Sequence, residues 1–390
     1  MQNRRRIAVV IPKYGLLGGA EGFAAELTER IANDPRLDVH VFANRWVSSS
    51  DRVNFHKVPI IRFPRFLTSP GFALFAGRKI AAAGPFELIH THDRIFRAGI
   101  YTMHGVPHRW WVREVRKKRM SLFDRALAGV EDHLVLRGGC RRFLAVSGLV
   151  RDVFVHEYGI APSLVEVIHP GVETAAYQGW DRESCRREIR ERYGIGREET
   201  LILFVSMNFA VKGLDYLLRG LAVLKKRSPA ASFRLLVVGH GDEKSYRRLS
   251  AELGIADGVV FAGAVEKKEL AGFYLASDFY AMLSRFDTFG MVVLEAMAAG
   301  LPVLISSRVG AKDLVEEGRN GFVIEDPADS GLVADRIETM LSSEIRRNMG
   351  AAARKTAEGN SWEAVAAKVI SVYETIWKDQ SLVNSKMPHP

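Results

Sequence analysis

The chain has 390 residues, 47% of them hydrophobic and 26% charged, a composition typical of soluble globular proteins and a length that suits two domains. No stretch approaches the roughly 18–20 apolar residues of a membrane-spanning helix, and the two cysteines, Cys140 and Cys185, match no metal or disulfide spacing and suit a reducing cytoplasm. The net charge of +10 comes from the first part of the chain, since residues 1–170 carry 26 Lys and Arg against 15 Asp and Glu and residues 171–390 carry 29 against 30.

Short β-branched runs alternate with amphipathic stretches, which is typical of a doubly wound parallel sheet in an α/β protein. The expected strands are 7–12, 39–44, 88–92, 99–104 and 142–147, followed after a break near 169–181 by 201–206, 233–239, 259–263, 279–283 and 302–306. This pattern predicts two Rossmann-like domains, 1–170 and 171–360. We expect a C-terminal helix over 361–377, packing back on the first domain, and a disordered polar tail over 378–390.

Ligands of open α/β sheets bind beyond the carboxyl ends of the strands, so motifs at those positions carry the most weight. The segment KYGLLGGAEGF (13–23) follows the first expected strand and opens a helix. Gly18 and Gly19 would let the backbone approach an anion at the helix N-terminus. The segment is neither G-x-G-x-x-G nor a Walker A loop, and a plain strand-to-helix turn is the structural alternative.

Four histidines, His90, His92, His104 and His108, lie on or after strands of the first domain. Their spacing matches no common metal-binding pattern, and the chain has no Asp-x-Asp to carry a divalent ion with a sugar nucleotide. No metal is therefore expected. His104, at the end of a strand and next to Gly105, is the histidine that we place in a cleft.

Residues 107–130 combine basic and aromatic side chains. The apolar positions from Trp111 to Val130 roughly fit one helical stripe, so the segment is expected to lie as an amphipathic helix on anionic lipid headgroups. An internal helix with a solvated basic face is the structural alternative, and a nucleic-acid patch is a third, without a motif to support it. The residues expected at the membrane are Arg109, Trp110, Trp111, Arg113, Arg116, Lys117, Lys118 and Arg119.

Three motifs follow strands of the second domain. Lys212 lies at a strand-to-helix junction, where a lysine can pair with phosphate, although a solvated lysine is the common alternative. Gly239 belongs to a G-x-G that permits close backbone approach, which is a weak signal. In RFDTFGMVVLEA (285–296), Asp287 and Glu295 flank Phe289-Gly290, which is consistent either with a capped, buried helix or with a ligand site.

Together these motifs resemble the retaining GT-B glycosyltransferases of family 4, in order and spacing over about residues 7–377. Among them the chain is most similar to the lipopolysaccharide core glucosyltransferase branch, on the KY…GG opening, the V-S-x-N-F-x-x-KG stretch, the basic segment and LEAMAAGLPVL. The resemblance implies a nucleotide sugar in the second domain and an acceptor in the first. It also implies metal-independent transfer, with a fixed cation and backbone dipoles stabilising the leaving group.

The resemblance also implies residue roles. Glu295 would bind the ribose hydroxyls and Asp287 the donor sugar, Lys212 and the Gly18-Gly19 loop would neutralise the diphosphate, and His104 would lie near the anomeric carbon. The implied catalytic residues are His104, Lys212 and Asp287. The implied donor-binding residues are Gly18, Gly19, Ser206, Lys212, Gly239, Asp287, Phe289, Gly290, Met291, Val292 and Glu295.

The chain departs from the family pattern at two places. Ser206 and Met207 stand where the family usually has an arginine, and the first acid is Asp287 where the family usually has glutamate. Both departures bear on the donor sugar, and the first bears on donor affinity.

We therefore expect a cytoplasmic hexosyltransferase, peripheral on the inner face of the cytoplasmic membrane. It would transfer glucose from UDP-glucose to a lipid-linked glycan such as the lipopolysaccharide core. GDP-mannose, UDP-GlcNAc or UDP-galactose are alternative donors. A UDP-sugar epimerase or a soluble glucan synthase would use a similar co-substrate, and a basic nucleic-acid-binding protein is the alternative from a different class, although no nucleic acid partner is expected.

Overall fold

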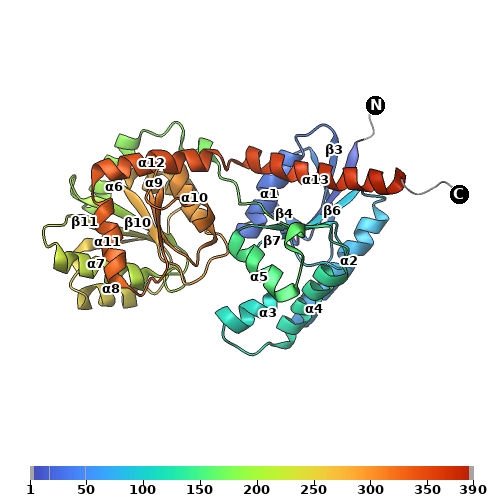
Figure 1. Cartoon of the computed structure of the whole chain (residues 1–390), viewed down its shortest axis with the longest axis horizontal. Helices are drawn as coiled ribbons and strands as arrows, with labels where there is room; N and C mark the ends of the chain where they lie inside the picture. The colour runs from blue at the N-terminus through green and yellow to red at the C-terminus, as the bar shows by residue number, and fades with distance from the viewer. Residues whose placement is uncertain (1–3, 17, 49, 386–390) are drawn as a thin grey trace. The chain divides into compact units, whose positions relative to one another are not determined.

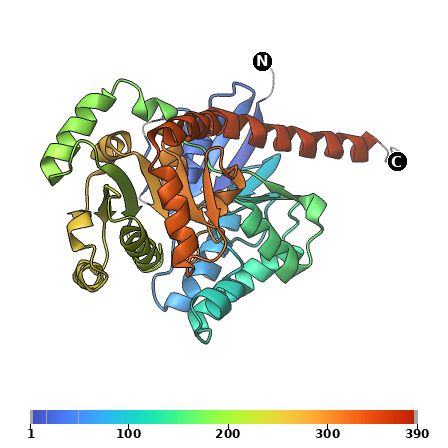
Figure 2. The same cartoon turned by 60° about the vertical axis from the view of Figure 1, so that its left-hand side comes forward.

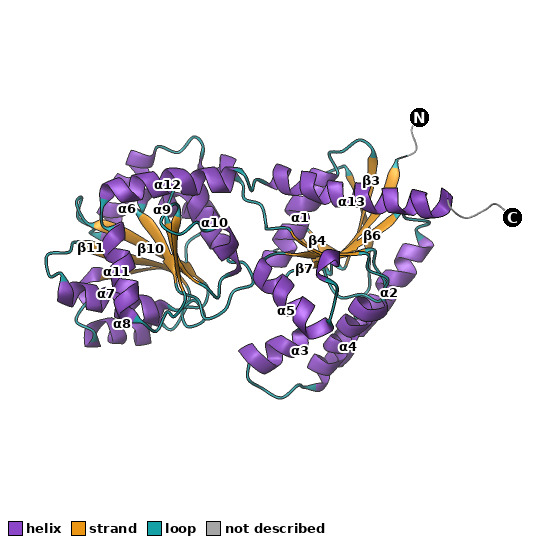
Figure 3. Ribbon diagram, viewed as in Figure 1, coloured by secondary structure: helices purple, strands orange, loops and turns teal. Residues whose placement is uncertain are grey.

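The computed structural model describes residues 4–16, 18–48 and 50–385, and its chain divides into two compact units. The first unit comprises the described residues up to Gly171 together with those from Trp362 onward, and the second unit comprises Val172–Ser361. Each unit is a parallel sheet packed between helices (Figures 1 and 3). The prediction of two doubly wound α/β domains is confirmed. The expected boundary at 170/171 lies one residue before the division in the structure.

The sheet of the first unit has seven parallel strands in the order β5-β3-β1-β6-β7-β8-β9. These strands are β1 (Arg5–Val10), β3 (Leu37–Ala43), β5 (Val53–Lys57), β6 (Leu88–Thr91), β7 (Ile100–Met103), β8 (Arg142–Ala145) and β9 (Val165–Val167). A separate two-stranded sheet pairs β2 (Lys13–Tyr14) with β4 (Arg45–Trp46). The order changes direction between β1 and β6, so the carboxyl ends of these two strands form the switch point of this sheet.

The sheet of the second unit has six strands in the order β12-β11-β10-β13-β14-β15. They are β10 (Thr200–Ser206), β11 (Phe233–Gly239), β12 (Val259–Gly263), β13 (Phe279–Met282), β14 (Val303–Ser306) and β15 (Gly321–Ile324). All pairings in this sheet are parallel. Its switch point lies between β10 and β13.

Helices cover the sheets. In the first unit they are α1 (Gly19–Ile31), α2 (Thr68–Ala82), α3 (His108–Trp110), α4 (Leu122–Arg137), α5 (Gly148–Tyr158) and α13 (Trp362–Ser385). In the second unit they are α6 (Arg182–Tyr193), α7 (Leu214–Arg227), α8 (Glu243–Glu252), α9 (Lys267–Ala276), α10 (Met291–Ala298), α11 (Ser330–Met340) and α12 (Ser343–Glu358). Short 3-10 turns lie at Arg65–Leu67, Pro162–Leu164, Thr174–Tyr177, Ala256–Gly258 and Gly310–Leu314, and a π-helical turn at Trp111–Val115.

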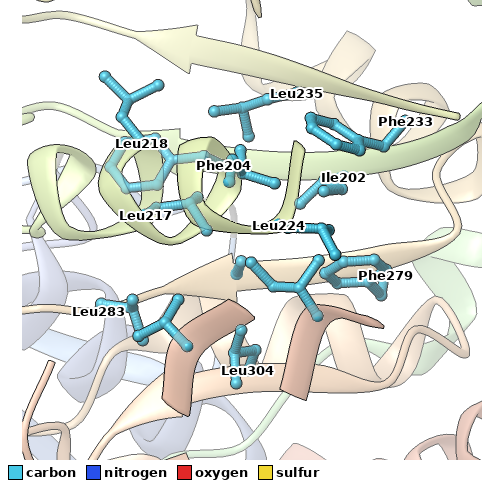
Figure 4. Close-up of a cluster of buried hydrophobic side chains, with 14 of the residues drawn as sticks. Ile202, Phe204, Leu217, Leu218, Leu224, Phe233, Leu235, Phe279, Leu283 and Leu304 are labelled. Atoms are coloured by element: carbon cyan, nitrogen blue, oxygen red, sulfur yellow. The ribbon is translucent and has the colours of Figure 1, made fainter. Parts of the chain in front are cut away.

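The core of the second unit lies between α7 and the sheet (Figure 4). Leu217, Leu221 and Leu224 recur at helical spacing on α7 and are fully buried, because they share the face that packs on Ile202 and Phe204 of β10. Burial of each such side chain contributes about 1.5–3 kcal/mol. This packing fixes the start of α7, and with it the loop that precedes the helix.

Helix α13 belongs to the first unit. Trp362 packs edge-on against Phe23 of α1, with ring centroids 5.4 Å apart, and the Tyr373 hydroxyl lies 2.6 Å from His90 Nδ1. The helix continues to Ser385 (Figure 2), so the expectation of disorder from residue 378 is wrong for 378–385. No proline follows Trp377 before Pro388, so nothing in the sequence interrupts the helical hydrogen bonds. The expected tail over 386–390 lies outside the described residues.

Within the described part of the chain, no helix is both long and apolar enough to cross a membrane.

Candidate functional site

The first side of the candidate site is the loop after β10. Ser206 ends this strand, and its hydroxyl accepts a hydrogen bond from the Asn208 amide at 2.8 Å. The Asn208 side chain in turn accepts one from the Val211 amide at 3.1 Å. This turn leads to Lys212 and to Gly213, which precedes α7 with φ 71°. A Cβ on Gly213 would overlap the carbonyl oxygen of Leu283, so only glycine lets the loop lie this close to the end of β13.

The second side of the site is the loop after β13. The Ser284 hydroxyl lies 2.9 Å from the Val211 carbonyl oxygen, and the Arg285 amide donates to the same oxygen at 2.8 Å. The Arg285 guanidinium pairs with Asp215, at the start of α7, at 2.7 Å. The two loops at the switch point are therefore bound to each other by a backbone hydrogen bond, a hydrogen bond from the Ser284 side chain, and an ion pair.

Lys212 and Asp287 meet where these loops join, and they form an ion pair. The Asp287 amide donates to the Arg308 carbonyl at 3.0 Å, and the Asp287 carbonyl accepts from the Gly310 amide at 3.0 Å. The backbone around the carboxylate is thus held on both sides. Both side chains are partly buried, with exposed fractions of 23% for Lys212 and 15% for Asp287, so their charges are only partly screened by water.

Helix α10 begins directly after this loop. Gly290, with φ 90°, precedes it, and a Cβ there would lie 2.9 Å from the Val309 side chain. The first N–H groups of a helix have no acceptor within the helix, so those of Met291 and Val292 give this end a partial positive charge. Glu295 lies one turn further on, four residues after Met291, and therefore on the same face of the helix.

Two tyrosines, the buried Tyr274 and the half-buried Tyr177, lie near the Glu295 carboxylate. The Tyr274 hydroxyl of α9 donates to Glu295 Oε2 at 3.0 Å. Burial, followed by the charge of Glu295, raises the pKa of both Tyr274 and Tyr177, so both phenols stay protonated. Sequence reasoning missed these tyrosines, because a tyrosine on another helix has no spacing relation to Glu295.

The end of β11 completes this edge of the sheet. Gly239 has φ 119°, and a Cβ on it would overlap the carbonyl oxygen of Ser206. The His240 amide donates to that oxygen at 2.9 Å. The predicted donor-binding residues of the second unit thus lie along one edge of its sheet: Ser206, Lys212, Gly239, Asp287, Phe289, Gly290, Met291, Val292 and Glu295.

The predicted residues of the first unit lie at its own switch point. Gly18 precedes α1 with φ 153°, and its carbonyl accepts from the Gly22 amide at 2.9 Å. Glu21 is close enough that a Cβ on Gly18 would overlap its carboxylate, so an acidic group lies beside the expected anion loop. Gly19 is the first residue of α1, and residue 17 lies outside the described residues.

His104 is part of a stack of three imidazoles at the ends of β6 and β7. Its Nε2 lies 3.0 Å from His92 Nδ1, and the rings of His90 and His92 are 4.4 Å apart. The Phe23 ring meets His104 edge-on at 4.8 Å. Burial, and then the charge of Arg94, lowers the pKa of His104 to about 3. The imidazole is therefore neutral at physiological pH and can orient a ligand by hydrogen bonding.

The basic segment 107–130 does not form one helix, so that expectation is wrong. After α3 and the π-helical turn, Lys117 has φ 49°, and α4 starts anew with a capping box between Ser121 and Asp124. The buried residues also differ from the expected apolar stripe. Val112 is buried, whereas Val115 and Leu122 are 37% and 70% exposed.

Several basic residues of this segment pair within the first unit. Arg109 pairs with Asp132 at 2.6 Å, and Arg113 pairs with Glu157 at 2.9 Å. Arg116 lies over the Trp111 ring at 5.2 Å and also reaches the buried Asp124 at 3.1 Å. Lys117, Lys118 and Arg119 are exposed, and they form no ion pair with any described residue.

In the described ranges, no group of three or more His, Cys, Asp or Glu side chains is placed to hold a metal ion.

Comparison with known proteins identifies the family. A family model for glycosyl transferases group 1 matches residues 185–356, and one for glycosyltransferase family 4 matches residues 17–176. The D-inositol 3-phosphate glycosyltransferase of Streptomyces scabiei is 34% identical over 316 residues, covering 76% of this chain and 69% of the relative. The chain belongs to the family 4 glycosyltransferases. The resemblance inferred from its motifs is confirmed at this level.

Two further relatives show that the names within this family vary. The D-inositol 3-phosphate glycosyltransferase of Corynebacterium efficiens is 33% identical, over only 53% of its own length. A GDP-mannose-dependent alpha-(1-6)-phosphatidylinositol monomannoside mannosyltransferase of Mycobacterium tuberculosis is 28% identical over 380 residues, covering 90% of this chain and 93% of the relative.

Solved structures share the fold. WaaG, a glycosyltransferase involved in lipopolysaccharide biosynthesis, superposes with a TM-score of 0.74 at 20% identity, covering 94% of this chain and 99% of WaaG. HepE of Anabaena, solved in complex with UDP-glucose, has a TM-score of 0.69 at 18% identity, covering 95% of this chain and 99% of HepE. At these identities the likeness shows the fold alone, which is the two-unit GT-B fold.

Proposed function

We propose that this glycosyltransferase transfers a hexose from a nucleotide sugar to a lipid-linked glycan, retaining the anomeric configuration and without a metal ion. Glucose from UDP-glucose, moved onto a glycan such as the lipopolysaccharide core, is the form that we put first. The proposal rests on one observation: Lys212, the start of α10 and Glu295 all lie at the switch point of the second unit's sheet.

Each of these groups matches one part of a nucleotide sugar. A carboxylate held by a buried tyrosine, as Glu295 is by Tyr274, can accept two hydrogen bonds from the ribose hydroxyls. The N–H groups from Phe289 to Val292 and the Lys212 ammonium can meet the negative charge that develops on the departing diphosphate. Because these cations and dipoles are fixed in advance, the reaction would need no metal ion for this purpose.

The ion pair between Lys212 and Asp287 gives the aspartate two roles in this proposal. It holds the ammonium at the mouth of the loop, and its remaining oxygen lone pairs accept hydrogen bonds from the donor sugar. Ser206, Gly239 and the Gly18-Gly19 loop would line the donor, and the neutral His104 would orient the sugar near its anomeric carbon rather than supply a proton.

GDP-mannose is the second candidate donor. It is favoured by the relative named as a GDP-mannose-dependent mannosyltransferase, which matches 90% of this chain. That relative is also named for a phosphatidylinositol mannoside, and this supports a lipid-linked acceptor here. With a lipid acceptor, the exposed Lys117, Lys118 and Arg119 would hold the enzyme at an anionic membrane surface, on the cytoplasmic face.

A thermal-shift panel tests the donor. UDP-glucose, UDP-galactose, UDP-GlcNAc and GDP-mannose are each added to the full chain at the same concentration. A ligand at about 100 times its Kd stabilises the folded state by about 2.7 kcal/mol, which corresponds to several degrees in Tm for units of this size. We expect the largest shift with UDP-glucose, and a larger shift with GDP-mannose would move the proposal to that donor. No shift with any of them would contradict nucleotide-sugar binding.

The stereochemistry is tested separately. Transfer from the preferred donor to an acceptor, followed by NMR of the product's anomeric proton, should show the configuration of the donor sugar. The inverted anomer would contradict retention, and loss of transfer in excess EDTA would contradict metal independence.

A further inference from the structure

One cavity of the second unit is lined by arginines. It has a volume of about 500 Å³ and lies beside the residues that precede β13 and β14. Two of its arginines come from α6 and three from α12. They are Arg182, Arg186, Arg346, Arg347 and Arg354. Amino ends of parallel strands share one edge of a sheet, so this arginine pocket lies at the edge opposite to the proposed donor site.

The acidic groups of the pocket do not balance these charges. Asp278 is the one acid among its lining residues, and its carboxylate is already engaged. One oxygen pairs with Arg186 at 2.9 Å, and the other pairs with Arg190, outside the lining, at 3.0 Å and accepts from the Leu201 amide at 2.7 Å. Five arginines against one aspartate leave a formal charge of +4 on the lining.

The remaining arginines repel one another. Burial, and then the charge of Arg186, lowers the pKa of Arg182. Burial also lowers the pKa of Arg346. The charge of Asp278 opposes this shift, and the charges of Arg186 and Arg347 add to it. Arginine remains charged at neutral pH despite such shifts. Arg347 forms no ion pair with a described residue, and the partner of Arg354 is the exposed Glu358 at 3.2 Å.

Two glycines shape the wall of the pocket between α10 and α12. A Cβ on Gly350 of α12 would overlap the Gly300 carbonyl oxygen, so the two glycines let α12 pack closely on the end of α10. A Cβ on Gly300 would lie 3.5 Å from the Arg182 guanidinium. The guanidinium groups of the two helices therefore border a hollow that has the volume of a small ligand.

We propose that this arginine pocket binds the phosphate groups of a small phosphorylated molecule, at a site separate from that of the nucleotide sugar. Guanidinium groups match phosphate oxygens with paired hydrogen bonds, and several of them on a concave surface favour more than one phosphate charge. The phosphate could be that of a soluble compound or of a lipid headgroup, since the recognised chemistry is the same.

Titration calorimetry with inorganic pyrophosphate tests the site. The titration uses the full chain with UDP in excess, so that a diphosphate site at the other edge of the sheet is already filled. We expect pyrophosphate to bind under these conditions. Absence of pyrophosphate binding would overturn the proposal, whatever UDP does.

A double variant, Arg347→Gln with Arg354→Gln, removes two exposed guanidinium groups without touching Asp278. We expect about a hundredfold loss of pyrophosphate affinity, about tenfold for each charged hydrogen-bonding group. The control, Arg227→Gln with Arg248→Gln, removes the same charge from exposed positions elsewhere in the second unit and should bind as the wild type does. Equal affinity in the pocket variant and the control would overturn the proposal.

Vesicle binding distinguishes the two sources of phosphate. Phosphatidylcholine vesicles with and without phosphatidic acid are sedimented with the wild type and with the pocket variant. Binding that needs phosphatidic acid, is lost in the variant and is displaced by pyrophosphate would identify a lipid headgroup. Vesicle binding that is the same in both proteins, together with weakened pyrophosphate binding in the variant, would identify a soluble phosphate compound.

Discussion

At the scale of single residues, the candidate site depends on pairs that join distant parts of the chain. Lys212 and Asp287 are 75 residues apart, and Tyr274 and Glu295 are 21 apart. The motifs predicted Lys212, Asp287 and Glu295, because each follows a strand. They could not predict that Lys212 and Asp287 pair with each other, or that Tyr274 donates to Glu295, since both contacts depend on how neighbouring strands and helices are packed.

The imidazole stack makes the first unit sensitive to acid. Burial, and then the charge of His104, lowers the pKa of His90 to about 3, from about 6.5 in an unfolded chain. The unfolded state therefore binds more protons in this range, so stability is lost as pH falls from about 6.5 toward 3. For His90 alone the loss at pH 5 is on the order of 2 kcal/mol.

We therefore expect the free energy of unfolding, from urea denaturation, to be lower at pH 5 than at pH 7. Because His90→Gln removes one of the titrating groups, its stability should depend less steeply on pH, even though the variant is less stable at pH 7. Equal stability of the wild type at both pH values would contradict the burial of neutral imidazoles.

At the scale of elements, the sequence predicted best the strands that consist of several consecutive buried residues. The central strands are runs of apolar residues, and their positions were predicted to within two residues at each end. The strands β5, β9 and β15 were not predicted. VNFHK carries polar residues at an edge of the sheet, VEV has three residues, and GFVI begins with glycine, so none has the length or composition of a buried strand.

The sequence itself indicates where the basic segment 107–130 is interrupted. SLFD (121–124) has the S-x-x-D pattern of a capping box before an apolar run, and this pattern indicates a helix start. The capping box at Ser121 therefore outweighs the loose apolar periodicity of 107–130 and divides the segment into two helices.

Gly213 tests how tightly the Lys212 loop is held. Gly213→Ala should destabilise the protein by about 3 kcal/mol or more, because the added methyl group meets the Leu283 backbone in a left-handed conformation. Gly194→Ala is the matched control, since Gly194 has φ 63° with no atom within 4 Å of an added Cβ, and should cost only about 1–2 kcal/mol. Similar losses in urea denaturation for both variants would show that the close contact at Gly213 does not matter.

At the scale of the whole molecule, the length indicated two domains, and the alternation of strand and helix patterns correctly predicted that both are α/β. The excess positive charge is concentrated in the first part of the chain. Much of that charge is paired internally, as Arg109 and Arg113 show. Fewer basic side chains can therefore face a membrane than the sequence suggested. Within the basic segment they are Lys117, Lys118 and Arg119. The donor and acceptor cannot be predicted at this scale, because they depend on a few side chains in a shared fold.

Replacing Lys117, Lys118 and Arg119 by Ser tests the membrane surface. At about 1 kcal/mol for each basic residue, co-sedimentation with anionic vesicles should weaken by up to about a hundredfold. The control replaces Lys225, Lys226 and Arg227, an exposed run of the same composition in the second unit, and should bind as the wild type does. Equal losses in both variants would indicate a general charge effect.

The measurement that tests the central claim most directly is calorimetric titration of UDP into the wild type and Glu295→Gln. If Glu295 binds the ribose hydroxyls, the variant should lose about 1.5–3 kcal/mol of binding free energy, or about 10- to 150-fold in affinity. Glu252→Gln, an exposed change on α8, should bind UDP as the wild type does, and circular dichroism should show all three proteins folded. Equal UDP affinity in wild type and Glu295→Gln would contradict the assignment of the donor site.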